Sequence, residues 1–161
     1  METGSRKAGS LLPMKRVLCA LLLVACSPGK PPAPKKVEWV HPPAEVPVAA
    51  FVEKEQKRAV PDHRRVLVYV GATWCEPCRR FHEAVGKGAL DPTFGDLRLV
   101  EFDLDKDQIR LRDAGYDPKL IPLLALPAPD GFATGKQMEG SIKGDGAVDQ
   151  MVPRLRSLLA Q

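Results

Sequence analysis

The segment VLVYV, Val66 to Val70, constrains the fold of this 161-residue chain more than any other segment. It is a continuous run of β-branched, aliphatic and aromatic residues, without the alternation of a strand that has one face in water. Such a run predicts a strand that is buried on both faces in a largely parallel sheet, with helices on both sides of that sheet. We therefore expect an α/β fold.

The rest of the chain predicts further elements around this strand. Before it, apolar residues at helical spacing indicate a helix from Pro47 to Ala59, and VEWVHPP at 37–43 fits a short edge strand. After it we expect, in order, a helix from the cysteines to Gly86, a strand at 97–102, a helix at 108–114, strands at 121–126 and 133–139, and a terminal helix at 148–159 that Pro153 kinks or begins. The turn at 129–131 is short, so the last two strands must be antiparallel.

The charge distribution argues against nucleic-acid binding. The chain has 24 basic and 20 acidic residues, a formal net charge of +4. Four of the basic residues and one acid precede Cys26, which leaves 20 basic and 19 acidic residues and a net charge of +1 in the rest of the chain. Because this remainder is almost neutral and has no basic stripe, we expect no nucleic-acid partner.

The N-terminal segment MKRVLCALLLVAC, Met14 to Cys26, has the layout of a secretory signal. Two basic residues precede an apolar run that is too short to cross a bilayer, and small residues follow. Leu23 to Cys26 resembles the lipobox of bacterial lipoproteins, which implies cleavage before Cys26 and a lipid anchor on its sulfur. The protein would then face the periplasm from the bacterial cell envelope, and Ser27 favours the outer membrane. A plain secretory signal or a buried apolar helix is the alternative.

Cleavage and lipidation would leave two free thiols. Cys19 leaves with the signal and lipid consumes Cys26, so the exported protein keeps Cys75 and Cys78. In an oxidising compartment such a pair is either a small structural disulfide or a redox couple. A structural disulfide is the weaker alternative, because closing a two-residue loop removes little entropy from the unfolded chain.

Two cofactor interpretations of this pair fail on the neighbouring residues. Covalent haem attachment needs a histidine directly after the second cysteine, where this chain has Arg79. A zinc site needs four ligands, and Cys75, Cys78 and His82 supply at most three at a workable spacing. We therefore expect no metal and no cofactor, and favour the redox couple.

The position of the pair suggests a role for each sulfur. The chain reaches Cys75 just as the helix after the buried strand begins, and Pro77 is acceptable in its first turn. A sulfur there lies near unpaired N–H groups and the positive end of the helix dipole, which lower a thiol pKa. Cys78 lies one turn deeper. We expect Cys75 to attack and Cys78 to resolve.

These residues resemble the thioredoxin family. The match rests on WCEPC, Trp74 to Cys78, after a hydrophobic strand, and on Ile121-Pro122 opening a later strand; it covers roughly residues 46–160. The resemblance implies a three-layer α/β sandwich with a mixed, mostly parallel central sheet. It implies a Cys75–Cys78 disulfide flanked by Trp74, with Pro122 as a cis-proline packed against it. It also implies that Ile121 offers its backbone to an extended substrate segment.

The domain prediction follows from this resemblance and from the composition of the linker. Residues 1–25 are predicted to form a lipoprotein signal peptide. Residues 26–44 are predicted to form a Pro-rich linker, beginning SPGKPPAPKK, and a short edge strand. Residues 45–161 are predicted to form the thioredoxin-like domain.

Two departures from the family limit what the resemblance implies. Thioredoxin has a buried acid six residues before the first cysteine, where this chain has Tyr69, so water or another group, such as Glu76, must take part in proton transfer. The Glu-Pro dipeptide between the cysteines is similar to that of envelope reductases of cytochrome c maturation. However, the interval from Cys78 to Pro122 has no room for their extra insertion, or for the helical domain of strong periplasmic oxidases.

The sequence thus predicts a thiol:disulfide oxidoreductase of the bacterial cell envelope, more a reductase than an oxidase. Its expected partners are client proteins with disulfides or thiols, a membrane redox partner for recycling, and the membrane itself through Cys26. Two alternatives belong to other classes. One is a copper-handling module that uses Cys75, Cys78 and His82; the other is a non-catalytic thioredoxin-fold lipoprotein that binds partners.

Overall fold

The computed structural model describes residues 34–161. The predicted signal peptide, the lipid site at Cys26 and most of the predicted linker lie outside the described residues. Within residues 34–161, no helix is both long enough and apolar enough to cross a membrane.

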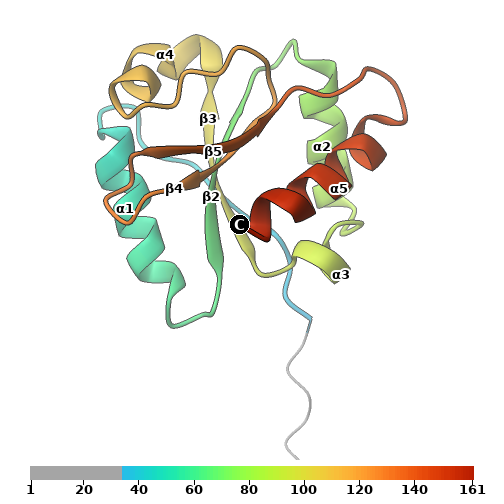
Figure 1. Cartoon of the computed structure of the whole chain (residues 1–161), viewed down its shortest axis with the longest axis horizontal. Coiled ribbons are helices and arrows are strands. Elements are labelled where there is room, and N and C mark those ends of the chain that lie inside the picture. Colours follow the sequence, from blue (N-terminus) through green and yellow to red (C-terminus); the bar gives the residue numbers. More distant parts are fainter. Residues whose placement is uncertain (1–33) are drawn as a thin grey trace, which may run out of the picture. The chain divides into compact units, whose positions relative to one another are not determined.

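The domain is built on a sheet of five strands in the order β1-β3-β2-β4-β5 (Figure 1). The strands are β1 (Glu38–Val40), β2 (Arg65–Gly71), β3 (Leu97–Asp103), β4 (Leu123–Pro127) and β5 (Ala133–Glu139). β3 pairs in parallel with β1 and β2, whereas β4 is antiparallel to both β2 and β5. All strands except β4 therefore run in the same direction, and the expected antiparallel final pair is confirmed.

Helices cover both faces of the sheet. α1 (Val48–Ala59) and α4 (Leu104–Asp113) pack on one face, whereas α2 (Glu76–Gly86), α3 (Asp91–Phe94) and α5 (Ala147–Leu159) lie on the other (Figure 1). Each face has its own hydrophobic core. This arrangement is the expected three-layer α/β sandwich with a mixed sheet, and the fold is thioredoxin-like.

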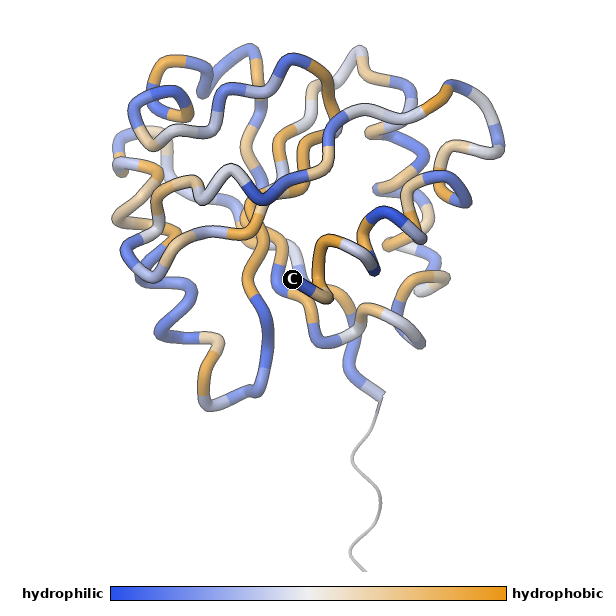
Figure 2. The backbone as a smooth tube through the Cα atoms, in the orientation of Figure 1, coloured by the Kyte–Doolittle hydropathy of each residue, from blue (hydrophilic) through white to orange (hydrophobic). Residues whose placement is uncertain are grey.

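The predicted central strand lies between the two cores. In β2, Val66, Val68 and Val70 face α1 and α4, and the intervening residues Leu67 and Tyr69 face α2 and α5. All five are buried, so the uninterrupted hydrophobic run reflects burial on both faces. Figure 2 shows this hydrophobic segment running through the middle of the domain.

Helix α4 begins earlier than its apolar pattern indicates. We expected a helix from Gln108, but α4 starts at Leu104 because Asp103 caps it. The Asp103 carboxylate accepts hydrogen bonds from the backbone N–H groups of Asp105 and Lys106, at 3.0 and 3.3 Å. These bonds satisfy N–H groups that have no partner within the helix, so a polar first turn can be helical.

Three other features differ from the predictions or add to them. Pro153 lies inside α5, whose N-cap is Gly146, and so does not mark the first turn. The short helix α3 was not predicted; it has Pro92 in its first turn. Strand β1 is hydrogen-bonded into the sheet, so the sheet includes residues before the boundary at 45 that the sequence suggested.

Candidate functional site

The two cysteines join the end of β2 to the start of α2. β2 ends at Gly71, and Cys75 is the N-cap of α2 in an extended conformation. The sulfur of Cys75 accepts a hydrogen bond from the backbone N–H of Cys78 at 3.2 Å. The two residues form a disulfide with a Cα–Cα distance of 5.2 Å. The same N–H group and the helix dipole would stabilise a thiolate on Cys75 after reduction.

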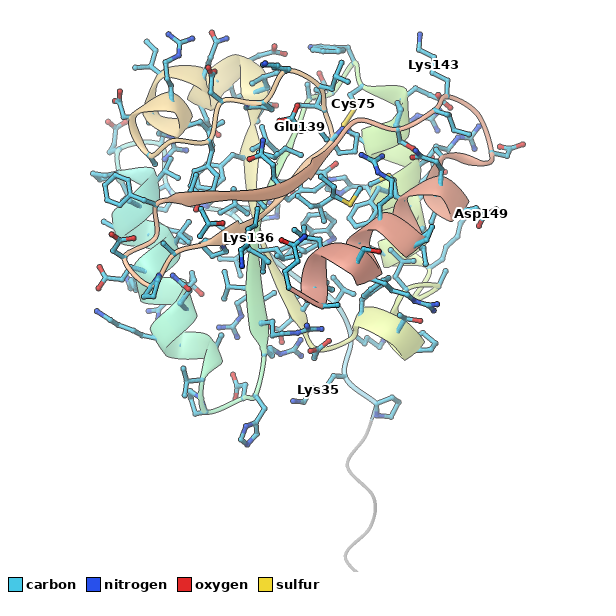
Figure 3. The ribbon with its side chains drawn as sticks, in the orientation of Figure 1. Lys35, Cys75, Lys136, Glu139, Lys143 and Asp149 are labelled. Carbon is cyan, nitrogen blue, oxygen red and sulfur yellow. A yellow bond between two sulfur atoms is a disulfide. The ribbon has the colours of Figure 1, made fainter. Side chains whose placement is uncertain are left out.

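The cysteines border two different clefts. The Cys75 cleft, about 330 Å³, is lined by Cys75, Trp74, Leu120, Ile121, Lys119 and Lys143, among others. The Cys78 cleft, about 830 Å³, lies at the carboxyl ends of β2 and β3 and is lined by Cys78, Tyr69, His82, Glu101, His41 and Arg110, among others. Figure 3 labels Cys75 at the start of α2 and Lys143 in the loop between β5 and α5. Each sulfur therefore has its own approach from the surface.

The other residues that the resemblance implied are found around the Cys75 cleft. The Trp74 side chain is 66% exposed, and its indole N–H donates a hydrogen bond to Asp105 at 2.9 Å. The Ile121–Pro122 peptide bond is cis, as expected. Ile121 lines the cleft directly before β4. Exposed Trp74 and Leu120 give this cleft an apolar rim.

Glu76, the sequence-based candidate for proton transfer, is held by other groups. Its carboxylate accepts hydrogen bonds from the backbone N–H of Gly144 at 3.0 Å and from the guanidinium of Arg80 at 3.1 Å. These two hydrogen bonds, the first being the stronger influence, lower the pKa of Glu76. A carboxylate stabilised in this way is a weak proton acceptor. Its evident role is to tie the loop before α5 to the start of α2.

Tyr69 occupies the place of the missing acid and makes no polar contact. Its side chain is fully buried, and its hydroxyl has no hydrogen-bond partner among the residues that the structure describes. Burial, and then the negative charge of Glu101, raise the pKa of this phenol far above its ordinary value. Tyr69 therefore stays protonated and packs as an aromatic residue, stacked on Phe81 and edge-on to Trp39.

A cluster of titratable side chains lies beside Tyr69. Glu101 on β3 is directly opposite Tyr69 in the parallel register of β2 and β3. Nε2 of His82 lies 2.7 Å from one carboxylate oxygen of Glu101, and Nδ1 of His41 lies 3.3 Å from the other. The ring of His82 is stacked on Trp39, with the centroids 4.2 Å apart. His82 is thus held between an aromatic ring and a carboxylate.

Sequence reasoning noted His82 but missed Glu101. One signal was available, because Glu101 has the same strand parity as Leu97 and Leu99, which face α2. A charged residue at a core-facing position usually has a specific partner. In residues 34–161, no group of three or more histidine, cysteine, aspartate or glutamate side chains has a geometry that could hold a metal ion. The geometry thus gives the copper alternative no support.

Comparisons with known proteins agree on the fold and go no further. No protein-family model matches the chain, and no curated protein has a significantly similar sequence. Among solved structures, the chain is similar to oxidised thioredoxin O1 from Arabidopsis thaliana, with 20% identity over 79% of this chain and 97% of that chain, and a TM-score of 0.43. It is also similar to a mutant thioredoxin from Halobacterium salinarum, with 22% identity over 75% and 91% and a TM-score of 0.40.

Proposed function

We propose that this protein is a thiol:disulfide oxidoreductase that exchanges disulfides with client proteins through Cys75 and Cys78. One observation carries the proposal: the Cys75 sulfur lies at the N-terminus of α2, bonded to a backbone N–H and open to a cleft. That position favours the thiolate, which is the nucleophile in disulfide exchange. A purely structural disulfide gains nothing from this placement.

The proposed reaction has two steps. As a reductase, the Cys75 thiolate attacks one sulfur of a client disulfide, forms a mixed disulfide and releases the other client sulfur as a thiolate, which takes up a proton. The Cys78 thiolate then attacks the Cys75 sulfur, and the bond from Cys75 to the client breaks. Two electrons pass from the cysteine pair to the client, and the protein leaves with the Cys75–Cys78 disulfide. As an oxidase, the same steps run in reverse.

The Cys75 cleft is the proposed binding site for the client. By the family resemblance, the backbone of Ile121 pairs with an extended client segment beside the disulfide, and exposed Trp74 and Leu120 contact its apolar side chains. Lys119 and Lys143 line the same cleft. This position beside the attacking sulfur supports the assignment.

The cellular setting is also a proposal. We infer that the protein acts in the bacterial cell envelope, anchored by lipid on Cys26 and facing the periplasm from the outer membrane. A membrane redox partner would keep it reduced. The support is the pattern from Met14 to Cys26. Replacing Cys26 with alanine should abolish incorporation of labelled palmitate; unchanged labelling would refute the anchor.

The function is tested by reduction of insulin disulfides with dithiothreitol as electron source. The purified full chain should accelerate precipitation of the insulin B chain, and Cys75→Ser should abolish the acceleration. Cys78→Ser should instead accumulate a mixed disulfide, because the second step is blocked. If Cys75→Ser retained the full rate, the oxidoreductase proposal would be wrong.

The direction of electron flow is tested by the equilibrium reduction potential of the couple in glutathione or dithiothreitol buffers. A potential near that of thioredoxin, about −270 mV, would support the proposed reductase. A potential near about −120 mV would instead indicate an oxidant that introduces disulfides.

A further inference from the structure

The second step of the proposed reaction needs a proton acceptor. A thiolate attacks a disulfide far faster than a thiol does, so Cys78 must lose its proton before it can resolve the mixed disulfide. The Cys78 residue is only 2% exposed, and burial disfavours an unpaired thiolate. Neither residue considered so far can take this proton, because Tyr69 is a buried phenol and the Glu76 carboxylate is held by Gly144 and Arg80.

His82 is placed to serve Cys78. It follows Cys78 by four residues on α2, so the two side chains lie on the same face of the helix, one turn apart. Both residues line the Cys78 cleft, which is large enough to hold several water molecules. Water in this cleft can join the thiol to the imidazole. A route for the proton therefore exists without passing through the client's cleft.

Glu101 sets the orientation of the imidazole. With Nε2 of His82 at 2.7 Å from a carboxylate oxygen, this nitrogen carries the hydrogen and Nδ1 is left as the acceptor in the neutral ring. Stacking on Trp39 fixes the plane of the ring. A carboxylate that holds a histidine in this way also stabilises the imidazolium that forms when Nδ1 accepts a proton.

We propose that His82, oriented by Glu101, accepts the proton of the Cys78 thiol through water in the Cys78 cleft while the mixed disulfide is resolved. The inference rests on the proposed function. The Cys78 S–H bond breaks, the proton moves to Nδ1 of His82, and the sulfur keeps the electron pair with which it attacks Cys75. The client sulfur leaves as a thiolate, and the imidazolium returns its proton to that sulfur or to solvent. Glu101 is a positioning residue in this scheme.

Several other groups contribute to the electrostatic environment of His82. His41 follows β1 and contacts the second oxygen of Glu101, and Tyr69 lies edge-on to the imidazole. The remaining charged side chains that line the cleft are those of Arg79, Asp103, Lys106, Asp107 and Arg110. Asp107 and Arg110 pair with each other at 2.8 Å, which leaves Glu101 as the carboxylate in contact with the ring.

The test measures each step separately with glutathione disulfide as the probe. The reduced full chain is mixed with the probe, quenched in acid at successive times, and the protein–glutathione mixed disulfide is quantified by mass. His82→Gln and Glu101→Gln should slow decay of the mixed disulfide by about 100-fold near pH 7, the lower range for general base catalysis. At about pH 10, above the ordinary thiol pKa of about 8.5, their rates should approach that of the unchanged protein.

Matched variants separate this role from a structural one. Glu83→Gln, at an exposed position next to His82, should follow the unchanged protein at every pH. In a Cys78→Ser background, His82→Gln should leave the rate of mixed-disulfide formation within about twofold, because the first step does not use the base. Glu101→Gln retains the stacked ring and so provides a test if His82→Gln folds poorly.

Two results would overturn the inference. One is a pH profile for resolution that is the same in His82→Gln, Glu101→Gln and the unchanged protein. The other is an equal slowing at all pH values, which would mean that His82 and Glu101 only support the packing of α2. Both results leave the proposed function intact, whereas failure of the unchanged protein to form any mixed disulfide would remove the function itself.

Discussion

Replacing Tyr69 with phenylalanine should stabilise this protein, although most substitutions in a core destabilise it. The Tyr69 hydroxyl is fully buried, and no described residue forms a hydrogen bond with it. Leaving a polar group buried without a partner costs about 1–3 kcal/mol, and deletion of the hydroxyl removes that cost. The oxygen atom leaves only a small void, whose lost contacts offset a few tenths of a kcal/mol. We expect a net gain of about 1–2 kcal/mol in the free energy of unfolding.

Tyr116 provides a matched control with the opposite sign. It is also fully buried, but its hydroxyl donates a hydrogen bond to the backbone carbonyl of Gly131 at 2.8 Å. Tyr116→Phe would leave that buried carbonyl without this donor and should destabilise the protein by about 1–3 kcal/mol. The two variants lose the same atom from equally buried rings, so the difference between them reports only the hydrogen bond.

Urea unfolding of the disulfide-bonded protein at pH 7 measures both changes. Tyr69→Phe should raise the midpoint without changing the m-value, and Tyr116→Phe should lower it. In thermal unfolding, each kcal/mol corresponds to roughly 4 °C for a domain of this size. If Tyr69→Phe were as destabilising as Tyr116→Phe, the hydroxyl would have a partner and the reasoning about Tyr69 would be wrong.

The remaining predictions concern a surface carboxylate and two glycines. Because its native contacts, chiefly the Gly144 N–H, lower the pKa of Glu76 from 4.5, this carboxylate stabilises the folded state above about pH 4.5, and the effect is lost as the pH falls through the native pKa. Chemical unfolding from pH 7 to 3 should therefore show Glu76→Gln less stable than the unchanged protein at pH 7 and equal to it at pH 3; a constant difference would contradict this. Gly131→Ala should lose about 2–5 kcal/mol, because Gly131 has φ +83° and a Cβ there would clash with the carbonyl oxygen of Ala49. Gly135→Ala, at φ +77° with open space around it, should lose only about 1–2 kcal/mol in the same urea titration, and equal losses would show that the clash is relieved.

The parts of the fold that were predicted from sequence depend on local patterns. The bounds of β5 and of the helix after Cys75 follow from strand and helix signals that lie within a few residues. The early start of α4 was missed because it depends on a capping side chain, Asp103, in a segment with no apolar periodicity. The short helix α3 has a single buried side chain, that of Phe94, so it has no periodic signal.

The candidate site divides in the same way. Trp74, Cys75, Cys78, Ile121 and Pro122 were identified because they belong to two short motifs whose spacing is readable along the chain. The interaction of Glu101 with His82 and His41 was not identified. These three residues come from β3, α2 and the segment after β1, and nothing in their spacing relates them.

The sequence by itself determined that a buried strand leads into a helix that begins at a cysteine pair, because hydrophobic run length, helix capping and cysteine spacing are local properties of the chain. Only the tertiary structure decided which groups surround the second cysteine. The parallel register of β2 and β3 sets Glu101 beside Tyr69, and the packing of α2 on that face brings His82 within 2.7 Å of Glu101. Such contacts depend on strand order and register, which are fixed by the burial of the whole sheet between its two layers of helices.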